Sequence, residues 1–181
     1  MKNITFRPAT LNDAETLYSV KLSAFSDEFE KFKYAETDSI FENIVEDSKS
    51  DNPKEEMFSM DWHKRVCSFG NYTLVIEDEA KIIGSIVTLP GKHSGHEYPN
   101  VNMSDDDLNV LICLYVLPEY KNKGIGQLAI KNMEALHPDK KWILDTPDVS
   151  IKNKHFYEKC GYNAGSLTGP NNILRIFTKG F

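Results

Sequence analysis

The residues best suited to chemistry lie in one stretch of the chain, positions 110–162. An apolar run ends at Pro118, and a short basic loop then leads to Gly124-Ile125-Gly126 and an amphipathic segment. Glycines let a ligand approach the backbone closely, and a helix that begins on them turns several N–H groups and its positive end toward one point. Three lysines add positive charge: Lys121, Lys123 and Lys131. The stretch predicts a cradle for a phosphorylated cofactor, and so an enzyme rather than a passive module.

The same glycines allow other interpretations. A plain turn between a strand and a helix, with its lysines in solvent, would need no ligand. The dinucleotide fingerprint GxGxxA is also matched, because Ala129 follows the glycines and Asp145 ends a strand about 20 residues later. In that fingerprint the first glycine directly follows a strand, whereas residues 118–123 intervene here. A nicotinamide-dependent oxidoreductase is therefore a lesser hypothesis, and a P-loop is excluded because GxxxxGK[ST] is absent.

The surrounding elements have to position this loop. Thr10 and Asp13 resemble a capping box at the start of a first helix, and Gly161 stands where a left-handed cap would end the last one. Asp78-Glu79-Ala80 predicts a hairpin turn. We expect strands at 4–7, 72–77, 81–89, 107–117, 142–144 and 173–178, further helices at 38–46, 125–136 and 150–159, and an exposed loop at 46–57. This order predicts one α/β domain over residues 1–181, a mixed sheet with helices on both faces.

Composition limits the class of protein. A net charge of −6 argues against nucleic-acid binding, which needs a basic face, and suits a cationic small substrate better. The three cysteines show no CxxC or Cys/His ligand spacing, so we expect neither a disulfide framework nor a metal site. No apolar run approaches the ~20 residues that span a bilayer, and the first residues lack the apolar region of a signal peptide. We expect a cytoplasmic protein without a membrane anchor.

Residues 116–126 read VLPEYKNKGIG, and residues 156–162 read FYEKCGY. Both segments resemble motifs of the GNAT N-acetyltransferase superfamily, whose motif A is [QR]xxGx[GA] after a strand that ends V-x-P-E-[YF]. The segment FYEKCGY, residues 156–162, resembles motif B, and the two motifs cover roughly a third of the chain. Lys121 departs from the usual Gln or Arg, keeping the charge but losing planar hydrogen bonding. An Asn often found seven residues before the motif-B tyrosine is Ser150 here, and Asn153 lies closer.

The resemblance implies a fold, a cofactor and a reaction. The fold would be a mostly antiparallel sheet of six to seven strands, splayed between the fourth and fifth, with a bulge near 115–117 that opens a slot. Acetyl coenzyme A would donate its acetyl group directly to a primary amine of a small molecule, peptide or protein, and a homodimer would be common for the superfamily. A catalytically silent coenzyme A sensor is the alternative. The implied cofactor-binding residues are Tyr115, Val116, Leu117, Lys121, Asn122, Lys123, Gly124, Ile125, Gly126, Gln127, Asn153, Phe156 and Tyr157.

Amine attack on a thioester needs an oxyanion donor, a group that protonates the leaving thiolate, and a base. We assign the Val116 N–H to the first role and the Tyr157 phenol to the second. Asn153, on the same helix face as Tyr157, could bond the cofactor arm. The base stays open among Asp107, His93, His96 and a water chain. Segment 58–69 either lines the acceptor pocket or packs over a sheet edge, and Cys113 and Cys160 have no nucleophilic role because their surroundings are apolar.

Overall fold

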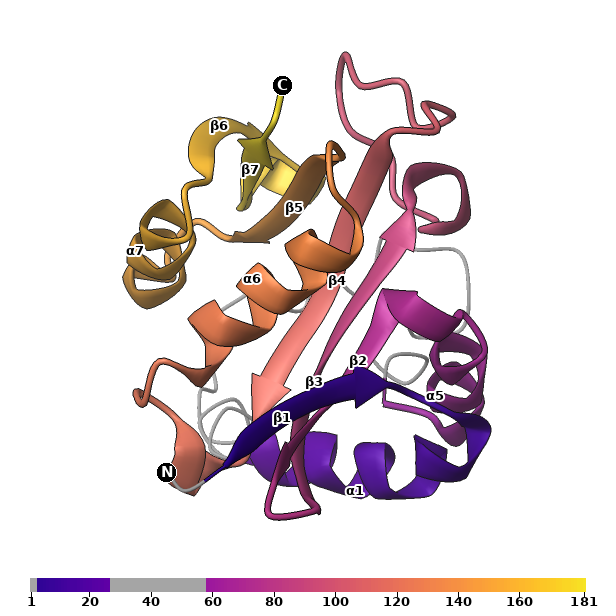
Figure 1. Cartoon of the computed structure of the whole chain (residues 1–181). Helices are drawn as coiled ribbons and strands as arrows, with labels where there is room; N and C mark the ends of the chain where they lie inside the picture. Colours follow the sequence, from indigo (N-terminus) through magenta and orange to yellow (C-terminus); the bar gives the residue numbers. More distant parts are fainter. Residues whose placement is uncertain (1–2, 27–57) are drawn as a thin grey trace.

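A seven-stranded sheet forms the centre of the protein (Figure 1). The computed structural model describes residues 3–26 and 58–181, and the predicted helix at 38–46 and loop at 46–57 lie outside them. The strands follow the order β1-β2-β3-β4-β5-β7-β6, and only β4 and β5 are parallel neighbours. They are β1 (Ile4–Pro8), β2 (Thr73–Asp78), β3 (Lys81–Pro90), β4 (Leu108–Val116), β5 (Lys141–Pro147), β6 (Asn163–Thr168) and β7 (Leu174–Lys179). The predicted mixed, mostly antiparallel sheet is confirmed.

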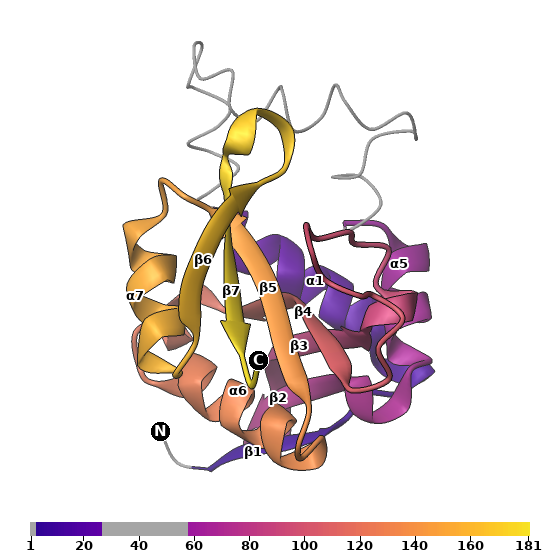
Figure 2. The ribbon, with the colours of Figure 1, turned by 90° about the horizontal axis from the view of Figure 1, so that it is seen from above.

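Helices cover both faces of this sheet (Figure 2). Helix α1 (Ala14–Ala24) and helix α5 (Met60–Cys67) lie on one face, while α6 (Ile125–Leu136) and α7 (Ile151–Lys159) lie on the other. The strands contribute side chains to both faces because successive side chains of a strand point to opposite sides of the sheet. Val87 packs with the α1 and α5 residues, and its neighbour Ile86 packs with those of α6. Within the described residues, no helix has the length and apolarity needed to cross a membrane.

Two elements were not predicted. Strand β6 is exposed at five of its six positions, so no apolar alternation marks it in the sequence. Helix α5 is only eight residues long, and its sequence mixes charged groups with the buried Trp62 and Val66. The Ser59 side chain accepts the Trp62 N–H at the start of α5, an N-cap that could have been recognised. Both elements depend on tertiary contacts more than on a local pattern.

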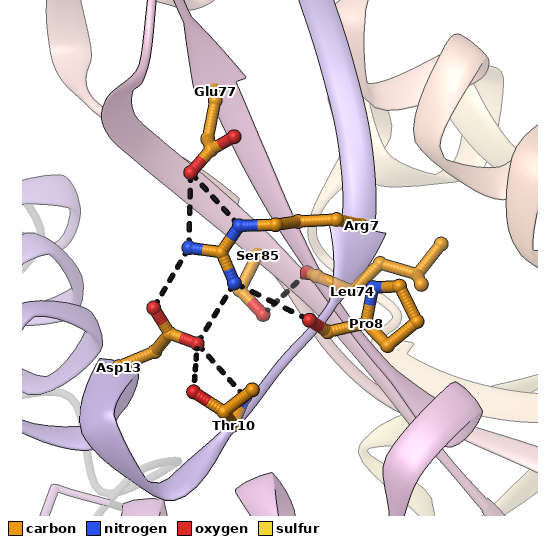
Figure 3. A network of polar contacts seen from close by, with 7 residues as sticks. All are labelled: Arg7, Pro8, Thr10, Asp13, Leu74, Glu77 and Ser85. Atoms are coloured by element: carbon orange, nitrogen blue, oxygen red, sulfur yellow. Dashed lines mark hydrogen bonds and ion pairs between the residues drawn. The ribbon is translucent and has the colours of Figure 1, made fainter.

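The start of the first helix is tied to the sheet edge by an ionic network (Figure 3). The Asp13 carboxylate accepts from the Thr10 N–H and hydroxyl at 2.8 and 2.9 Å, which confirms the predicted capping box. Arg7 donates to both Asp13 oxygens at 2.9 and 2.8 Å and to Glu77 through Nε at 3.0 Å. The guanidinium thus joins β1, β2 and the turn that precedes α1.

This network makes stability depend on pH. The hydrogen bond from Arg7 lowers the pKa of Asp13 to about 2, against the opposing effect of burial. A lowered pKa stabilises the folded state above the unfolded value near 4, and that contribution disappears as pH falls toward about 2. Because the Arg7 side chain is 38% exposed, solvent screens its interaction with Asp13, which then contributes about 1–2 kcal/mol to the free energy of unfolding. We therefore expect Asp13→Asn to unfold at lower urea than wild type at pH 7, with the difference shrinking as the pH approaches 2. Asp139→Asn in an exposed turn is the control; a difference that does not change with pH would contradict the assignment.

Candidate active site

The sheet opens between β4 and β5. These strands pair only over Leu108↔Lys141, Asn109↔Trp142 and Val110↔Ile143. Beyond that point β4 continues to pair with β3 as far as Val116, and β5 continues with β7. The predicted splay between the fourth and fifth strands is confirmed. From residue 111 onward, β4 therefore has one edge that β5 does not pair.

The bulge that accompanies this opening lies earlier than predicted. On β3, Val87 pairs with Cys113 and Thr88 with Leu111, so Ile112 is the extra residue. The expected position, near 115–117, was wrong, because Tyr115 and Val116 are in regular register with Ser85 and Gly84. A bulge bends its strand and ends regular pairing, and Ile112 comes directly after the last β4–β5 pair has formed at Val110.

Backbone groups on the open edge of β4 can be assigned from the ladder. The Leu117 N–H donates to the Ile83 carbonyl at 2.8 Å, on the β3 side. Because successive residues of a strand alternate, the Val116 N–H points away from β3, and so does that of Leu114. Tyr115 turns its backbone to β3, and its buried side chain donates to the Leu17 carbonyl at 3.3 Å. Of the predicted triplet, Val116 alone presents its polar groups to the open edge, and Leu114 is an addition that the sequence motif did not reveal.

The glycine loop forms the N-terminal end of α6. Asn122 and Gly124 have positive φ angles of 62° and 78°, and the first bond of the helix joins the Leu128 N–H to the Gly124 carbonyl at 3.1 Å. The N–H groups of residues 125–127 therefore have no acceptor within the helix and are available to an anion. Lys121 is placed differently from the prediction, since its N–H donates to the Pro118 carbonyl at 3.1 Å. Its ammonium donates to the Ala24 carbonyl at 2.7 Å, which ties the loop to the end of α1.

Gly126 brings the two sequence motifs together. A Cβ at this position would lie 3.1 Å from two atoms of the Phe156 ring and 3.6 Å from Leu114. A contact of 3.1 Å is tighter than usual, so a side chain at this position would push the Phe156 ring away by a few tenths of an ångström. Residues 30 positions apart in the chain, 126 and 156, therefore meet beside the open edge of β4.

Tyr157 lies on α7, the helix that covers the same face of the sheet as α6. Its half-buried ring packs against Phe177 and Tyr162, with centroids 5.5 and 6.0 Å away. Burial raises the pKa of Tyr157, and nearby Cys113 on β4 and Asp145 on β5 add to the rise. The phenol is thus within electrostatic reach of both separated strands. With a pKa above its ordinary value near 10, it is a hydrogen-bond donor at neutral pH.

The remaining residues of α7 support this position. The Asn153 amide donates to the Thr146 hydroxyl at 2.9 Å, so it joins α7 to β5. Gly161 has a φ of 86°, and the Tyr162 N–H donates to the Tyr157 carbonyl at 3.1 Å. The predicted left-handed cap and the packing of Tyr162 against Tyr157 are confirmed.

The residues proposed as bases have different surroundings. Asp107 precedes the paired end of β4, away from the opening, and forms an ion pair with Lys140 at 2.9 Å. His96 stacks beside Tyr98 with centroids 6.0 Å apart, and His93 lies 6.1 Å from Phe69. The described part of the chain holds no group of three His, Cys, Asp or Glu residues that could bind a metal ion.

Two side chains of segment 58–69 are buried. Trp62 is 4% exposed and His63 is fully buried, and they pack against Val20 and Tyr18 of α1, respectively. The Lys21 ammonium lies 3.7 Å from the centroid of the Trp62 ring. Cys113 shares this buried environment, and burial raises the pKa of its thiol, as expected of a cysteine with no nucleophilic role.

Solved structures share this fold over nearly the whole chain. The PaiA N-acetyltransferase of Thermoplasma acidophilum, in complex with coenzyme A, matches with a TM-score of 0.67 at 19% identity and covers 99% of both chains. Diaminobutyrate acetyltransferase EctA of Paenibacillus lautus, in complex with L-2,4-diaminobutyric acid and coenzyme A, matches with a TM-score of 0.61 at 9% identity. That match covers 98% of this chain and 95% of EctA. The fold is that of an acetyltransferase.

Sequence comparison specifies the family. The profile of the acetyltransferase (GNAT) domain matches residues 70–164, and the chain belongs to this family. The uncharacterized protein YrkN of Bacillus subtilis is 40% identical over 75 residues, a match that spans 40% of this chain and 40% of the length of that relative. The superfamily predicted from the two motifs is confirmed, and acetyl coenzyme A is its cosubstrate.

The dinucleotide interpretation does not fit this fold. A dinucleotide fingerprint belongs to a doubly wound parallel sheet, whereas β4 and β5 are the only parallel neighbours among the strands of residues 3–26 and 58–181. The residues present suit coenzyme A instead. An edge of β4 offers peptide groups to an extended arm, and free N–H groups at the start of α6 lie where that edge ends.

Proposed function

We propose that the protein transfers the acetyl group of acetyl coenzyme A directly to a primary amine of a small molecule or peptide. The observation that carries the proposal is that the open β4 edge lies beside the start of α6, where Gly126 approaches Leu114 and the N–H groups of residues 125–127 have no acceptor within the helix. An extended pantetheine arm would pair with the edge like an added strand, and the pyrophosphate would accept from the helix N–H groups. Two of the structural neighbours, PaiA and EctA, were crystallised with coenzyme A.

The chemistry conserves protons overall. The amine nitrogen bonds to the acetyl carbon, the carbon–sulfur bond breaks, one proton leaves nitrogen and one is gained by the departing thiolate. The negative charge that develops on the acetyl oxygen needs a fixed donor, and the N–H groups of Val116 and Leu114 both point to the open edge. A backbone N–H held by the sheet costs no reorganisation when this charge appears.

Tyr157 would act on the leaving sulfur. A raised pKa makes its phenol a weaker acid than an ordinary thiol, whose pKa is about 8.5. A hydrogen bond from the phenol to the developing thiolate therefore suits the group better than early, complete proton transfer. Asn153 contributes by holding α7 against β5, and Phe156 by packing on Gly126.

Cofactor binding tests the proposal directly. We expect acetyl coenzyme A to bind the purified protein in calorimetry, and free thiol to appear when a panel of polyamines, amino acids and peptides is added. Gly126→Val should weaken cofactor binding roughly tenfold or more, because its side chain would displace the Phe156 ring from the helix terminus. Gly165→Val is the matched control on β6, where a Cβ meets its nearest atom at 3.5 Å. A wild-type protein that binds no acetyl coenzyme A would disprove the function.

A further inference from the structure

Asp145 lies where β5 leaves β4. It is two residues beyond Ile143, the last residue of β5 that pairs with β4. If the parallel pairing continued, Asp145 would stand opposite Ile112, the bulge residue. The β4–β5 pairing has ended before this position, so Asp145 lies beside the gap between the two strands. Asp145 is half-buried, on the strand that forms the other side of the opening.

The side chain of Asp145 is on the face opposite α6 and α7. Trp142 and Leu144 pack with the α6 residues, whereas Ile143 belongs to the cluster with Tyr98 and Ile176. Because strand side chains alternate, Asp145 shares the face of Ile143. The cofactor cradle at the start of α6 and this carboxylate thus lie on opposite faces, with the gap between the strands joining them. An acceptor can approach the thioester from the side that the cofactor does not occupy.

A buried tyrosine lies near the carboxylate. Tyr98 is 6% exposed and packs in one cluster with Ile143 and Ile176, and Ile176 is the β7 residue that pairs with Asp145. Burial raises the pKa of Tyr98, and the charge of Asp145 adds to the rise, so the hydroxyl stays protonated. A carboxylate can accept several hydrogen bonds, so Asp145 has acceptor capacity for a cation. The charge of Asp145 also contributes to the raised pKa of the Tyr157 phenol.

We infer that Asp145 binds a second, non-reacting ammonium group of the acceptor on the α1 and α5 side of the gap, and so selects acceptors that carry a positive charge beside the amine that is acetylated. This inference rests on the proposed function and adds to it the charge of the substrate. A carboxylate is the side chain that recognises an alkylammonium by charge-assisted hydrogen bonds. The net charge of −6 is consistent with attraction of such a cation. Neither His93, His96 nor Asp107 is needed for this role.

Binding of 1,3-diaminopropane to the protein saturated with coenzyme A tests the inference. Asp145→Asn keeps the shape of the side chain and one acceptor oxygen but removes the charge, so folding should be preserved. We expect calorimetry to show diamine affinity reduced roughly tenfold or more in Asp145→Asn, with coenzyme A affinity and melting temperature unchanged. Asp139→Asn, the same change in an exposed turn, should bind the diamine like wild type.

The possible results distinguish a binding role of Asp145 from a structural one. If Asp145 had only a structural role, Asp145→Asn would leave diamine affinity intact, and the inference would fall. It would also fall if the wild-type complex bound no diamine. Failure of coenzyme A itself to bind would instead refute the proposed function. Tyr98→Phe should lower diamine affinity less than Asp145→Asn does, because it keeps the charge of Asp145.

Discussion

Tyr157→Phe is expected to lower kcat by roughly 10²-fold or more while changing the affinity for acetyl coenzyme A little. The substitution removes one hydroxyl and keeps the ring that packs against Phe177 and Tyr162. A donor to the leaving sulfur matters most in the transition state, when negative charge has developed there, so its loss affects kcat rather than ground-state binding. Steady-state kinetics with following of free thiol, together with calorimetry, would measure both quantities.

Tyr162→Phe is the matched control for this change. Tyr162 is a neighbouring buried tyrosine whose hydroxyl has no hydrogen-bond partner among the described residues. Removing an unsatisfied buried hydroxyl should leave stability unchanged or slightly improved, and kcat close to wild type. Equal kcat for Tyr157→Phe and wild type would show that Tyr157 has no catalytic role. Its role would then be to pack against Phe177 and Tyr162.

The sequence predicted the opening in the sheet better than its details. Motif residues such as Gly124 and Gly126 carry their information locally, because a positive φ angle or a missing Cβ is a property of one position. The bulge at Ile112 depends on the register between β3 and β4, and nothing in the apolar run 108–117 marks it. The sequence of a wholly apolar strand has the same pattern whether or not the strand contains a bulge.

Side chains whose surroundings come from distant parts of the chain could not be predicted from the sequence. The sequence placed Asp145 only in a dinucleotide fingerprint, and its neighbour Tyr98 is 47 positions away in a polar connection. Lys121 stands where a planar side chain is usual in motif A, and the structure shows its ammonium bound to the Ala24 carbonyl at 2.7 Å. A lysine can make this contact because its ammonium is a compact donor on a flexible side chain. The substitution of Lys for the usual Gln or Arg therefore has a structural role that the motif alone does not reveal.

Gly84→Ala is expected to damage stability and catalysis together, because Gly84 sits opposite Val116 where β3 and β4 approach most closely. A Cβ at residue 84 would lie 2.2 Å from the Tyr115 carbonyl oxygen and 2.9 Å from the Val116 Cα, and both distances are severe steric clashes. Both obstacles are backbone, so no rotation of a side chain can relieve them, and the strands must separate. Overpacking of this kind costs about 1–3 kcal/mol or more, which corresponds to a fall in melting temperature of about 2–12 °C for a chain of this size.

The catalytic effect of Gly84→Ala should exceed what this loss of stability explains. Moving the Val116 N–H by even about 1 Å from the position of the developing oxyanion can reduce the rate roughly 10²-fold. We therefore expect kcat to fall at temperatures where the variant is still folded, as judged by circular dichroism. Gly165→Ala is the control, since its Cβ would meet the Ile176 carbonyl at an ordinary 3.5 Å. If Gly84→Ala lowered the melting temperature but kept the wild-type kcat, the oxyanion donor would have to lie elsewhere on β4, and the Leu114 N–H, two residues further from the clash, would be the group to assign.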